Sequence, residues 1–468
     1  MFQKGEKKNE IENRTNFPKQ KSNKTQNLNK HNTEIKNTII SQNFNNNEGK
    51  IGTDLKKSNK EFKNNIKEGN IINNKPNQQI HNQNFNNNNN NDLNMKSSFS
   101  FTQFKEAPLI SLKNVGNSTY MSADVRLLSN IKSIVKYFMN EIKNIKLKAK
   151  NMPLSYNFTI LIYNLYNQDN LHKEYSLENF HKTSLELNPI FKGNSTKNAI
   201  DFFIFILNYL NNEDKIFLNQ KNIKDNKANI QEQISDFNEY FHYLKKYENS
   251  IIFNTFGWIN KKRKKCNNCS NEKIIYQHYF TFDLDIKKAV NDSIMNNKTQ
   301  LCIYDCIKYA TQKETLYNIF CEKCDDKCVF ESESSIVVSP NYFAFLLRLN
   351  DDNFETINKL KEYFNGIKIE EYLNLNDIIK VSNSINIADA EKKINVNFIL
   401  AGMVIYIYNK GTNNIEYKAY CCSPVDKNWY KYENEENYQI SKIDKSELFN
   451  STNLFPVILI YKTNNKDK

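Results

Sequence analysis

Two closely spaced cysteine pairs limit what this chain can fold into more than any other feature of its sequence. Cys266 and Cys269 form one CxxC turn, and Cys321 and Cys324 form a second one. Two such turns supply four thiolates, which close a tetrahedral shell that suits Zn²⁺ and leaves no open coordination position. The spacing therefore predicts a structural zinc site. The alternative is two turns without metal, packed as small apolar groups.

The other cysteines and the histidines are unevenly distributed along the chain. Cys302, Cys306 and Cys328 are alternative ligands at a poorer spacing, and we interpret them as buried or surface thiols. No cysteine precedes Cys266, and no histidine follows His278. The N-terminal half therefore lacks a thiol, and the last part of the chain lacks an imidazole.

The first 105 residues differ in composition from the rest. They are rich in Asn and Lys, include an unbroken asparagine run at 86–91, and show no sustained helical or strand period. Such a composition buries too little apolar surface to offset the entropy of the chain. We expect residues 1–105 to form a disordered tail and residues 106–465 to form the folded domain.

Charge and hydropathy narrow the classes of partner and compartment. Lysine and arginine outnumber the acids by 65 to 52, which favours acidic partners without naming one. The N-terminus MFQKGEKKNE has no apolar signal stretch, and no apolar run approaches the roughly 20 residues that span a bilayer. We expect an intracellular protein of the cytoplasm, the nucleus or both, with no membrane partner. The basic run 261–265 is expected to be a solvated turn, with a nuclear signal or a nucleic-acid patch as the alternative.

Apolar periodicity places helices early in the chain and strands late. Apolar residues recur at helical spacing over 122–147, and a second apolar helix is expected at 197–210. Strand-like runs follow at 276–286, 335–349, 396–408, 417–422 and 457–461. Helices first and strands later, with a metal site between them, predict an α+β fold.

An ordered series of short motifs resembles the ubiquitin-specific proteases. The segment LKNVGNSTYM at 112–121 is similar to their N-x-G-N-T-C-Y-M loop, and TKNAIDF at 196–202 is similar to Q-Q-D-A-x-E-F. Four later segments resemble the family's palm motifs, and together the series covers residues 109 to 462: SPNYFAFLLR at 339–348, IEYKAY at 415–420, WYKYEN at 429–434 and PVILIY at 456–461.

The resemblance implies a papain-like α+β fold with a helical thumb, a β-sheet palm and zinc-ribbon fingers. The thumb is expected over about 109–250, the fingers over about 251–335 and the palm over about 336–465. Active members of the family cleave the bond after the C-terminal glycine of ubiquitin. Ubiquitin, a ubiquitin-like protein or another protein is therefore the implied partner.

The catalytic positions implied by the resemblance hold unsuitable residues. Thr119 stands at the nucleophile, Glu416 at the base and Glu433 at the orienting position. A hydroxyl is far less acidic than a thiol, whose pKa is about 8.5, and a carboxylate of pKa about 4.3 is a weaker base than imidazole. Glu433 has no imidazole to orient, so we expect two carboxylates to face each other, which raises one pKa or separates them. Asn114 keeps the family's oxyanion position, either as a donor or as a turn former.

These replacements predict a catalytically inactive homologue that binds ubiquitin or a partner protein as a scaffold. Rescue of catalysis requires His172, His181, His242 or His278 to reach Thr119. One alternative is an active deubiquitinase with an unorthodox site that uses a late cysteine. A second alternative is a nucleic-acid-associated assembly protein. The mixed charges of the tail argue against it.

Overall fold

The computed structural model describes residues 99–104, 107, 109–166, 174–193, 198–219, 235–348, 359, 362, 364, 366–380, 395–409, 414–433, 440–449 and 455–464. The chain divides into two units, Met1–Asn94 and Met95–Lys468, and all described residues belong to the second. The predicted tail therefore lies outside the described residues, apart from 99–104.

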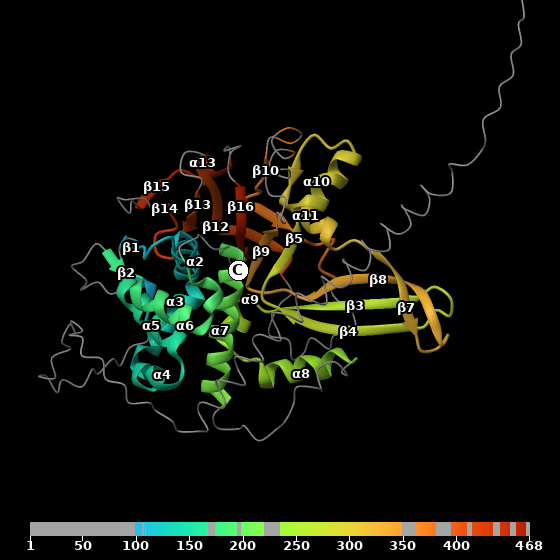
Figure 1. The fold of residues 1–468 in the computed structure, drawn as a ribbon, viewed down its shortest axis with the longest axis horizontal. Coiled ribbons are helices and arrows are strands. Elements are labelled where there is room, and N and C mark those ends of the chain that lie inside the picture. The colour runs from blue at the N-terminus through green and yellow to red at the C-terminus, as the bar shows by residue number, and fades with distance from the viewer. Residues whose placement is uncertain are drawn as a thin grey trace, which may run out of the picture. The chain divides into compact units, whose positions relative to one another are not determined.

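Most described helices precede the long strands and gather on one side of the second unit (Figure 1). The α-helices are α2 Thr119–Ser129, α3 Lys132–Glu141, α4 Ile145–Asn151, α5 Pro153–Tyr166, α6 Glu178–Leu187, α7 Ala199–Asn219, α8 Phe237–Tyr247, α9 Ile251–Phe256, α10 Ile286–Met295, α11 Ile303–Ala310 and α13 Lys445–Phe449. Three short 3₁₀ turns are η1 Phe101–Gln103, η2 Ile142–Asn144 and η3 Pro189–Phe191. Among the described residues, no helix combines the length and apolar character that crossing a bilayer requires.

The described strands form one large sheet, one four-stranded sheet and two short parallel pairs. The large sheet has the order β15-β14-β13-β12-β16-β9-β5, with β11 beside β12, and β5 is parallel to β9. Its strands are β5 Phe282–Asp285, β9 Tyr342–Arg348, β11 Tyr372–Asn374, β12 Asn397–Asn409, β13 Asn414–Cys422, β14 Trp429–Tyr432, β15 Ile440–Ile443 and β16 Phe455–Thr463. The short pairs join β1 Ser111–Lys113 to β2 Glu174–Ser176, and β6 Leu301–Cys302 to β10 Ile367–Lys368.

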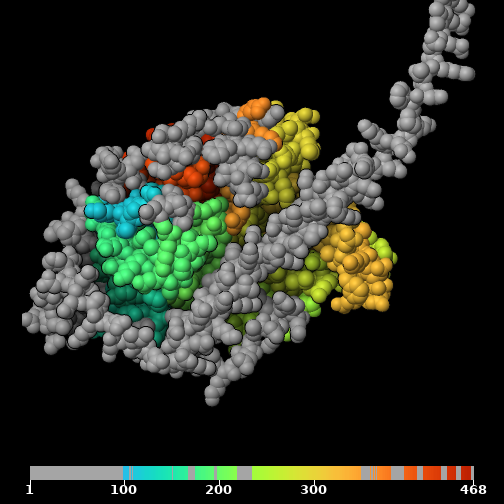
Figure 2. All heavy atoms as spheres, in the orientation of Figure 1, coloured from blue at the N-terminus to red at the C-terminus, as the bar shows by residue number. Residues whose placement is uncertain are grey.

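The four-stranded sheet is antiparallel and carries both cysteine pairs at one end. Its order is β4-β3-β8-β7, with β3 Trp258–Cys266, β4 Glu272–Tyr279, β7 Glu314–Cys321 and β8 Asp326–Val338. The β7–β8 end projects from the rest of the second unit, as Figure 2 shows. Helix α8 packs against the other end through a separate apolar cluster that includes Tyr240, Tyr276 and Val337.

The basic run 261–265 lies within β3, so its prediction as a turn was wrong. All five side chains are half-buried. Arg263 forms a two-point ion pair with Glu272 of β4, with N···O distances of 2.5 and 3.0 Å, and lies 3.8 Å from Glu333 of β8. Cross-strand acids thus pair with Arg263 of this run, and such pairs stabilise neighbouring strands.

The single helix expected at 122–147 is broken into shorter helices. Its apolar positions are buried as predicted, but α2 ends at Ser129 and α3 begins at Lys132. The side-chain Nδ2 of Asn130 donates to the Arg126 carbonyl at 2.9 Å, and the Tyr166 hydroxyl donates to the Ser129 carbonyl at 2.7 Å. These bonds occupy carbonyls that a continuous helix needs, which is why the apolar period alone did not reveal the break.

Two of the strands expected from the sequence each divide between two sheets. The run 276–286 forms the end of β4 and then β5, and the run 335–349 forms the end of β8 and then β9. At the first division, the indole of Trp258 donates to the Thr281 carbonyl at 3.2 Å. The first run stays aromatic across its division, whereas Ser339, Pro340 and Asn341 mark the second division in the sequence as a turn.

The last residues assigned to the tail are folded onto the helices. Phe99, Phe101 and Phe104 surround the ring of Tyr166, with centroid distances of 5.8 to 6.3 Å. The Phe99 amide donates to the Asn140 side chain at 2.8 Å. Aromatic burial of this kind stabilises ordered chain, so the folded part begins before residue 105.

Two adjacent acids of α7 bind the N-termini of two other helices. The carboxylate of Glu213 accepts from the backbone amides of Leu154 and Ser155 at 3.2 and 2.6 Å, at the start of α5. Asp214 accepts from the Ile251 amide at 2.7 Å, at the start of α9. The first amides of a helix have no partner within the helix, so α7 supplies the missing acceptors. Burial raises the pKa of Glu213 to about 7 against the effect of these hydrogen bonds.

We expect Glu213→Ala to lower the free energy of unfolding by about 1–3 kcal/mol, because it leaves two buried amides unpaired. Glu213→Gln keeps an acceptor and is expected to cost less. Urea unfolding followed by circular dichroism measures both. The control is Glu186→Ala on the exposed face of α6, with an expected change within about 0.5 kcal/mol. An equal effect of the alanine variants at 213 and 186 would contradict this prediction.

Candidate functional site

A tight loop presents Thr119 at the first turn of α2. Gly116 has a positive φ of 59°, a conformation that glycine adopts without strain. The buried Ser118 side chain accepts a hydrogen bond from the Val115 amide at 3.0 Å, which closes the loop. The Asn114 side-chain oxygen accepts from Ser122. The loop is therefore fixed by its own side chains, and Asn114 is anchored through its oxygen.

Helix α2 places Thr119 against strand β13. The backbone amide of Tyr417 donates to the Thr119 Oγ1 at 3.4 Å, and this is the one hydrogen bond of that hydroxyl among the described residues. The neighbouring Glu416 is half-buried, and its carboxylate has no hydrogen bond or ion pair with any residue that the structure describes. The structure thus brings the nucleophile and base positions to the same place without a carboxylate bond to the hydroxyl.

Glu433 was expected to face a second carboxylate, but its carboxylate is paired with two lysines. Its carboxylate accepts from Lys418 at 2.9 Å and from Lys431 at 2.6 Å. Burial alone raises the pKa of Glu433, but the two ammonium groups outweigh burial and hold that pKa below its usual range. Two lysines therefore pair with the Glu433 carboxylate where the family has an imidazole, and comparing the catalytic positions one by one did not reveal these lysines.

The histidines that the structure describes lie in the helical part of the fold and in β4. His278 of β4 is half-buried against α8, where its ring lies 3.1 Å from the Tyr240 hydroxyl and 3.9 Å from Glu248. Burial lowers its pKa. His242 is exposed on α8, and α8 lies beneath the four-stranded sheet, apart from α2 (Figure 1). His172 lies outside the described residues.

A buried acid on α2 was missed by the sequence analysis. The carboxylate of Asp124 is fully buried, and neither oxygen has a hydrogen-bond partner among the described residues. Burial holds the pKa of Asp124 well above its usual range, and Tyr120 and Tyr417 lie nearby. Asp124 lies three residues after Met121 and four before Leu128, on the helix face that they share. That spacing places Asp124 among apolar residues of one helix face, and it could have identified the buried acid from the sequence.

Four further cysteines lie away from the thiol cluster, and the environment of each favours the protonated thiol: Cys302, Cys306, Cys421 and Cys422. Burial raises the pKa of Cys306, Cys421 and Cys422. Burial and the hydrogen bond to Asp305, at 3.0 Å, raise the pKa of Cys302. The thiolate is the reactive form of cysteine, so none of these four positions has the environment of an activated nucleophile.

The two cysteine pairs converge at the end of the four-stranded sheet. The Sγ atoms of Cys266 and Cys324 lie 3.9 Å apart, and those of Cys269 and Cys321 lie 3.6 Å apart. All four sulfur atoms lie within 4.8 Å of one another. These distances are far above the S–S bond length of about 2.05 Å, so the four residues form a thiol cluster and no disulfide.

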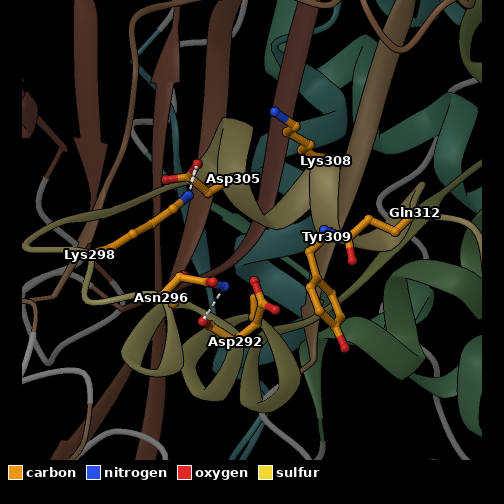
Figure 3. A pocket seen from close by; sticks show the side chains of 9 residues that line it. Asp292, Asn296, Lys298, Asp305, Lys308, Tyr309 and Gln312 are labelled. Carbon is orange, nitrogen blue, oxygen red and sulfur yellow. Dashed lines mark hydrogen bonds and ion pairs between the residues drawn. The ribbon is translucent and has the colours of Figure 1, made fainter.

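A polar hollow of about 190 Å³ lies between α10 and α11, away from Thr119. Figure 3 shows Asp292, Tyr309 and Gln312 around it, with Lys298 and Asp305 at one side. Lys298 and Asp305 form an ion pair at 2.5 Å. The hollow has no thiol or imidazole among its lining residues, so it adds no nucleophile to the site described above.

Comparison with known proteins settles the family. A family model described as ubiquitin carboxyl-terminal hydrolase matches residues 110–461. The chain belongs to this family. The ubiquitin carboxyl-terminal hydrolase Usp2 of Drosophila melanogaster is 20% identical over 364 residues, which is 76% of this chain and 35% of that protein. The chain thus matches about a third of the length of this curated relative.

Solved structures of the same family show that the fold is shared. The SAGA Ubp8/Sgf11/Sus1/Sgf73 DUB module bound to ubiquitin aldehyde matches with a TM-score of 0.55 and 18% identity, over 77% of this chain and 70% of that one. A yeast SAGA DUB module with an Sgf73 mutant gives 0.53 and 17% over the same shares. The predicted α+β fold of the ubiquitin-specific proteases is therefore confirmed.

Replacement of the buried acid is expected to stabilise the fold. We expect Asp124→Val to raise the free energy of unfolding at pH 7 by about 1–3 kcal/mol, because it removes an unsatisfied buried polar group. In the unfolded chain the carboxyl ionises near its usual pKa of about 3.9, whereas burial keeps it protonated in the fold. Wild-type stability should therefore fall, relative to Asp124→Val, as pH rises above about 4.

Urea unfolding at pH 5 and pH 8 measures both effects. Asp124→Asn is the matched control, because it is similar in shape and does not titrate. A wild-type chain that gains stability relative to Asp124→Asn as pH rises would show that Asp124 is ionised and paired in the fold.

Proposed function

We propose that this chain is a catalytically inactive member of the ubiquitin carboxyl-terminal hydrolase family that binds ubiquitin as a protein scaffold. The observation that carries the proposal is the environment of Thr119. Its hydroxyl accepts from a backbone amide, and no described imidazole or carboxylate is bonded to it. Nucleophilic catalysis requires a base within hydrogen-bond reach of the attacking group. Peptide-bond cleavage therefore has no starting step at this position.

The lysines around Glu433 support the same interpretation. In a working triad the third residue orients the base through a hydrogen bond. Here Lys418 and Lys431 occupy the Glu433 carboxylate and keep it ionised. Glu433 therefore acts as a structural anion between neighbouring strands, and Asn114 at the oxyanion position has no developing charge to stabilise.

Ubiquitin is the proposed ligand because of the relatives. Two of the similar solved structures are SAGA DUB modules bound to ubiquitin aldehyde and to monoubiquitin. Binding of a folded protein rests on a wide surface rather than on a few reacting atoms, so it survives the loss of a catalytic triad. We assign the helical part before about residue 250 to a thumb, the four-stranded sheet to fingers and the large sheet to a palm.

Structural zinc is the proposed occupant of the cysteine cluster. Tetrahedral Zn²⁺ with Zn–S bonds of about 2.3 Å places its sulfur ligands about 3.8 Å apart. The two measured S···S distances of 3.6 and 3.9 Å fit that shell. Hydrogen bonds from the Cys269 and Asn268 amides lower the pKa of Cys266 to about 6, which favours the thiolate. A shell of four cysteines is closed, so the metal would hold β3, β7 and β8 together.

The two alternatives receive less support. An active enzyme that uses another cysteine needs an ionised thiol, and burial raises the pKa of Cys302, Cys306, Cys421 and Cys422. A nucleic-acid-binding role for the run 261–265 has less support because the run lies within β3, its side chains are half-buried, and Arg263 is paired with acids of both neighbouring strands.

The proposal of inactivity predicts no turnover of a fluorogenic ubiquitin C-terminal amide and no adduct with a ubiquitin vinyl probe. Thr119→Cys should also be inactive, because a thiol without an imidazole lacks its base. The double variant Thr119→Cys/Glu416→His should regain reaction with the vinyl probe, detected by mass spectrometry. Isothermal titration calorimetry with ubiquitin tests binding separately. Wild-type turnover that Thr119→Ala abolishes would overturn the proposal.

Removal of the metal is expected to destabilise the protein. A ligand that binds the folded state alone stabilises it by about 2.7 kcal/mol when its free concentration is 100 times its Kd. We expect a strong chelator to lower the melting temperature, and added zinc to restore it. Cys321→Ser should melt at the lower temperature with or without chelator. An unchanged melting temperature of the wild-type chain, together with no bound zinc, would contradict the metal site.

A further inference from the structure

A fifth thiol packs against the four-cysteine cluster. Cys328 is the third residue of β8 and is 3% exposed. It belongs to the same buried cluster as Cys266, Cys321 and Phe330. Two other cysteines were considered as alternative ligands. Cys302 ends β6 directly before α11, and Cys306 lies within α11. Cys328 is therefore the alternative ligand that the fold brings to the metal site.

Contacts place Cys328 at one edge of the cluster. Its thiol interacts with the thiols of Cys324 and Cys266, and the sulfur atoms of those two residues are themselves 3.9 Å apart. The Asn268 side chain donates to the Cys328 Sγ at 3.5 Å, and this Sγ lies 3.6 Å from the Asp326 carbonyl. Cys328 thus packs beside Cys266 and Cys324, next to the group of four cysteines whose sulfur atoms all lie within 4.8 Å of one another.

The backbone around Cys324 differs from the backbone around Cys328. Cys324 lies in the turn between β7 and β8 and is half-buried, next to Asp325, whose φ is 52°. Cys328 lies in a strand that pairs with β7, with Ile319 opposite. The more exposed thiol is thus on the turn, and the buried one is on the ladder. Loss of the Cys324 thiol would leave Cys328 as the one further cysteine of this buried cluster beside the other three ligands.

We infer that Cys328 is a reserve zinc ligand that completes a four-thiolate shell with Cys266, Cys269 and Cys321 when Cys324 is lost. Zn²⁺ has no geometric preference from d electrons, so any four converging thiolates close its shell. In this exchange the Cys328 thiol releases its proton to solvent, because only the thiolate binds. The inference rests on the proposed zinc site. We expect Cys328 to keep zinc bound when Cys324 is lost, and to fail when Cys321 is lost.

The experiment compares four variants of the full chain with the wild type: Cys321→Ser, Cys324→Ser, Cys328→Ser and Cys324→Ser/Cys328→Ser. Bound zinc is measured by elemental mass spectrometry after dialysis against buffer that contains neither zinc nor chelator. We expect one zinc per chain in the wild type, Cys324→Ser and Cys328→Ser. We expect none in Cys321→Ser and in the double variant.

Substitution with Co²⁺ gives a readout of the ligand set itself. The thiolate-to-cobalt absorption of Cys324→Ser should equal that of the wild type if Cys328 has joined the shell. It should be weaker than that of the wild type if only three thiolates remain. Circular dichroism of each variant reports whether it is folded. For variants that do not fold, native mass spectrometry of the wild type after limited alkylation shows whether chains modified at Cys324 alone keep their zinc.

The outcomes separate the inference from the proposal beneath it. A wild-type chain without zinc would overturn the metal site and the inference together. A wild-type chain with one zinc, beside a Cys324→Ser variant as empty as Cys321→Ser, would overturn the reserve ligand alone. Loss of zinc from Cys328→Ser would show that Cys328 is a primary ligand instead.

Discussion

The packing of α2 against the large sheet is the contact on which the rest of the site depends. Gly402 of β12 has no side chain, and a Cβ there would lie 2.7 Å from the Leu127 Cδ1 of α2. This close approach brings the start of α2 to β13, where Thr119 meets the Tyr417 amide. Close packing of this kind leaves little freedom for adjustment. The contact between α2 and the sheet therefore sets the positions of Thr119 and Glu416. It does so whether or not the site has any catalytic activity.

The same helix carries charged groups into the interior. Arg126 is 4% exposed, donates to the Ile110 carbonyl and lies 4.8 Å from the centre of the Tyr432 ring. Asp124, two residues earlier, is buried with no partner among the described residues. A cation over an aromatic ring is stabilised by the ring's electrons, whereas an isolated carboxyl is stabilised only by keeping its proton. The two residues thus show the two ways in which this core accommodates ionisable groups.

The sequence was most informative where one residue type determines the chemistry. The two cysteine pairs predicted a four-thiol cluster because cysteines at that spacing have few other uses, and the motif series predicted the family. The replacements at Thr119 and Glu416 were also readable one by one. Lys418 was not read as a partner of Glu433, because pairing across strands depends on register. The break after Ser129 and the division between β4 and β5 arise from tertiary hydrogen bonds, which no local pattern contains.

The adjacent acids of α7 bind two helices that lie far apart in the sequence of the second unit. Glu213 binds the first turn of α5, and Asp214 binds the first turn of α9. Helix α9 ends at Phe256, and β3 starts at Trp258, so a shift of α7 is passed on to the strand that ends at the thiol cluster. Amide exchange at the starts of α5 and α9 should accordingly be governed by a single opening event, in which the helical layer and the long hairpins lose their protection together.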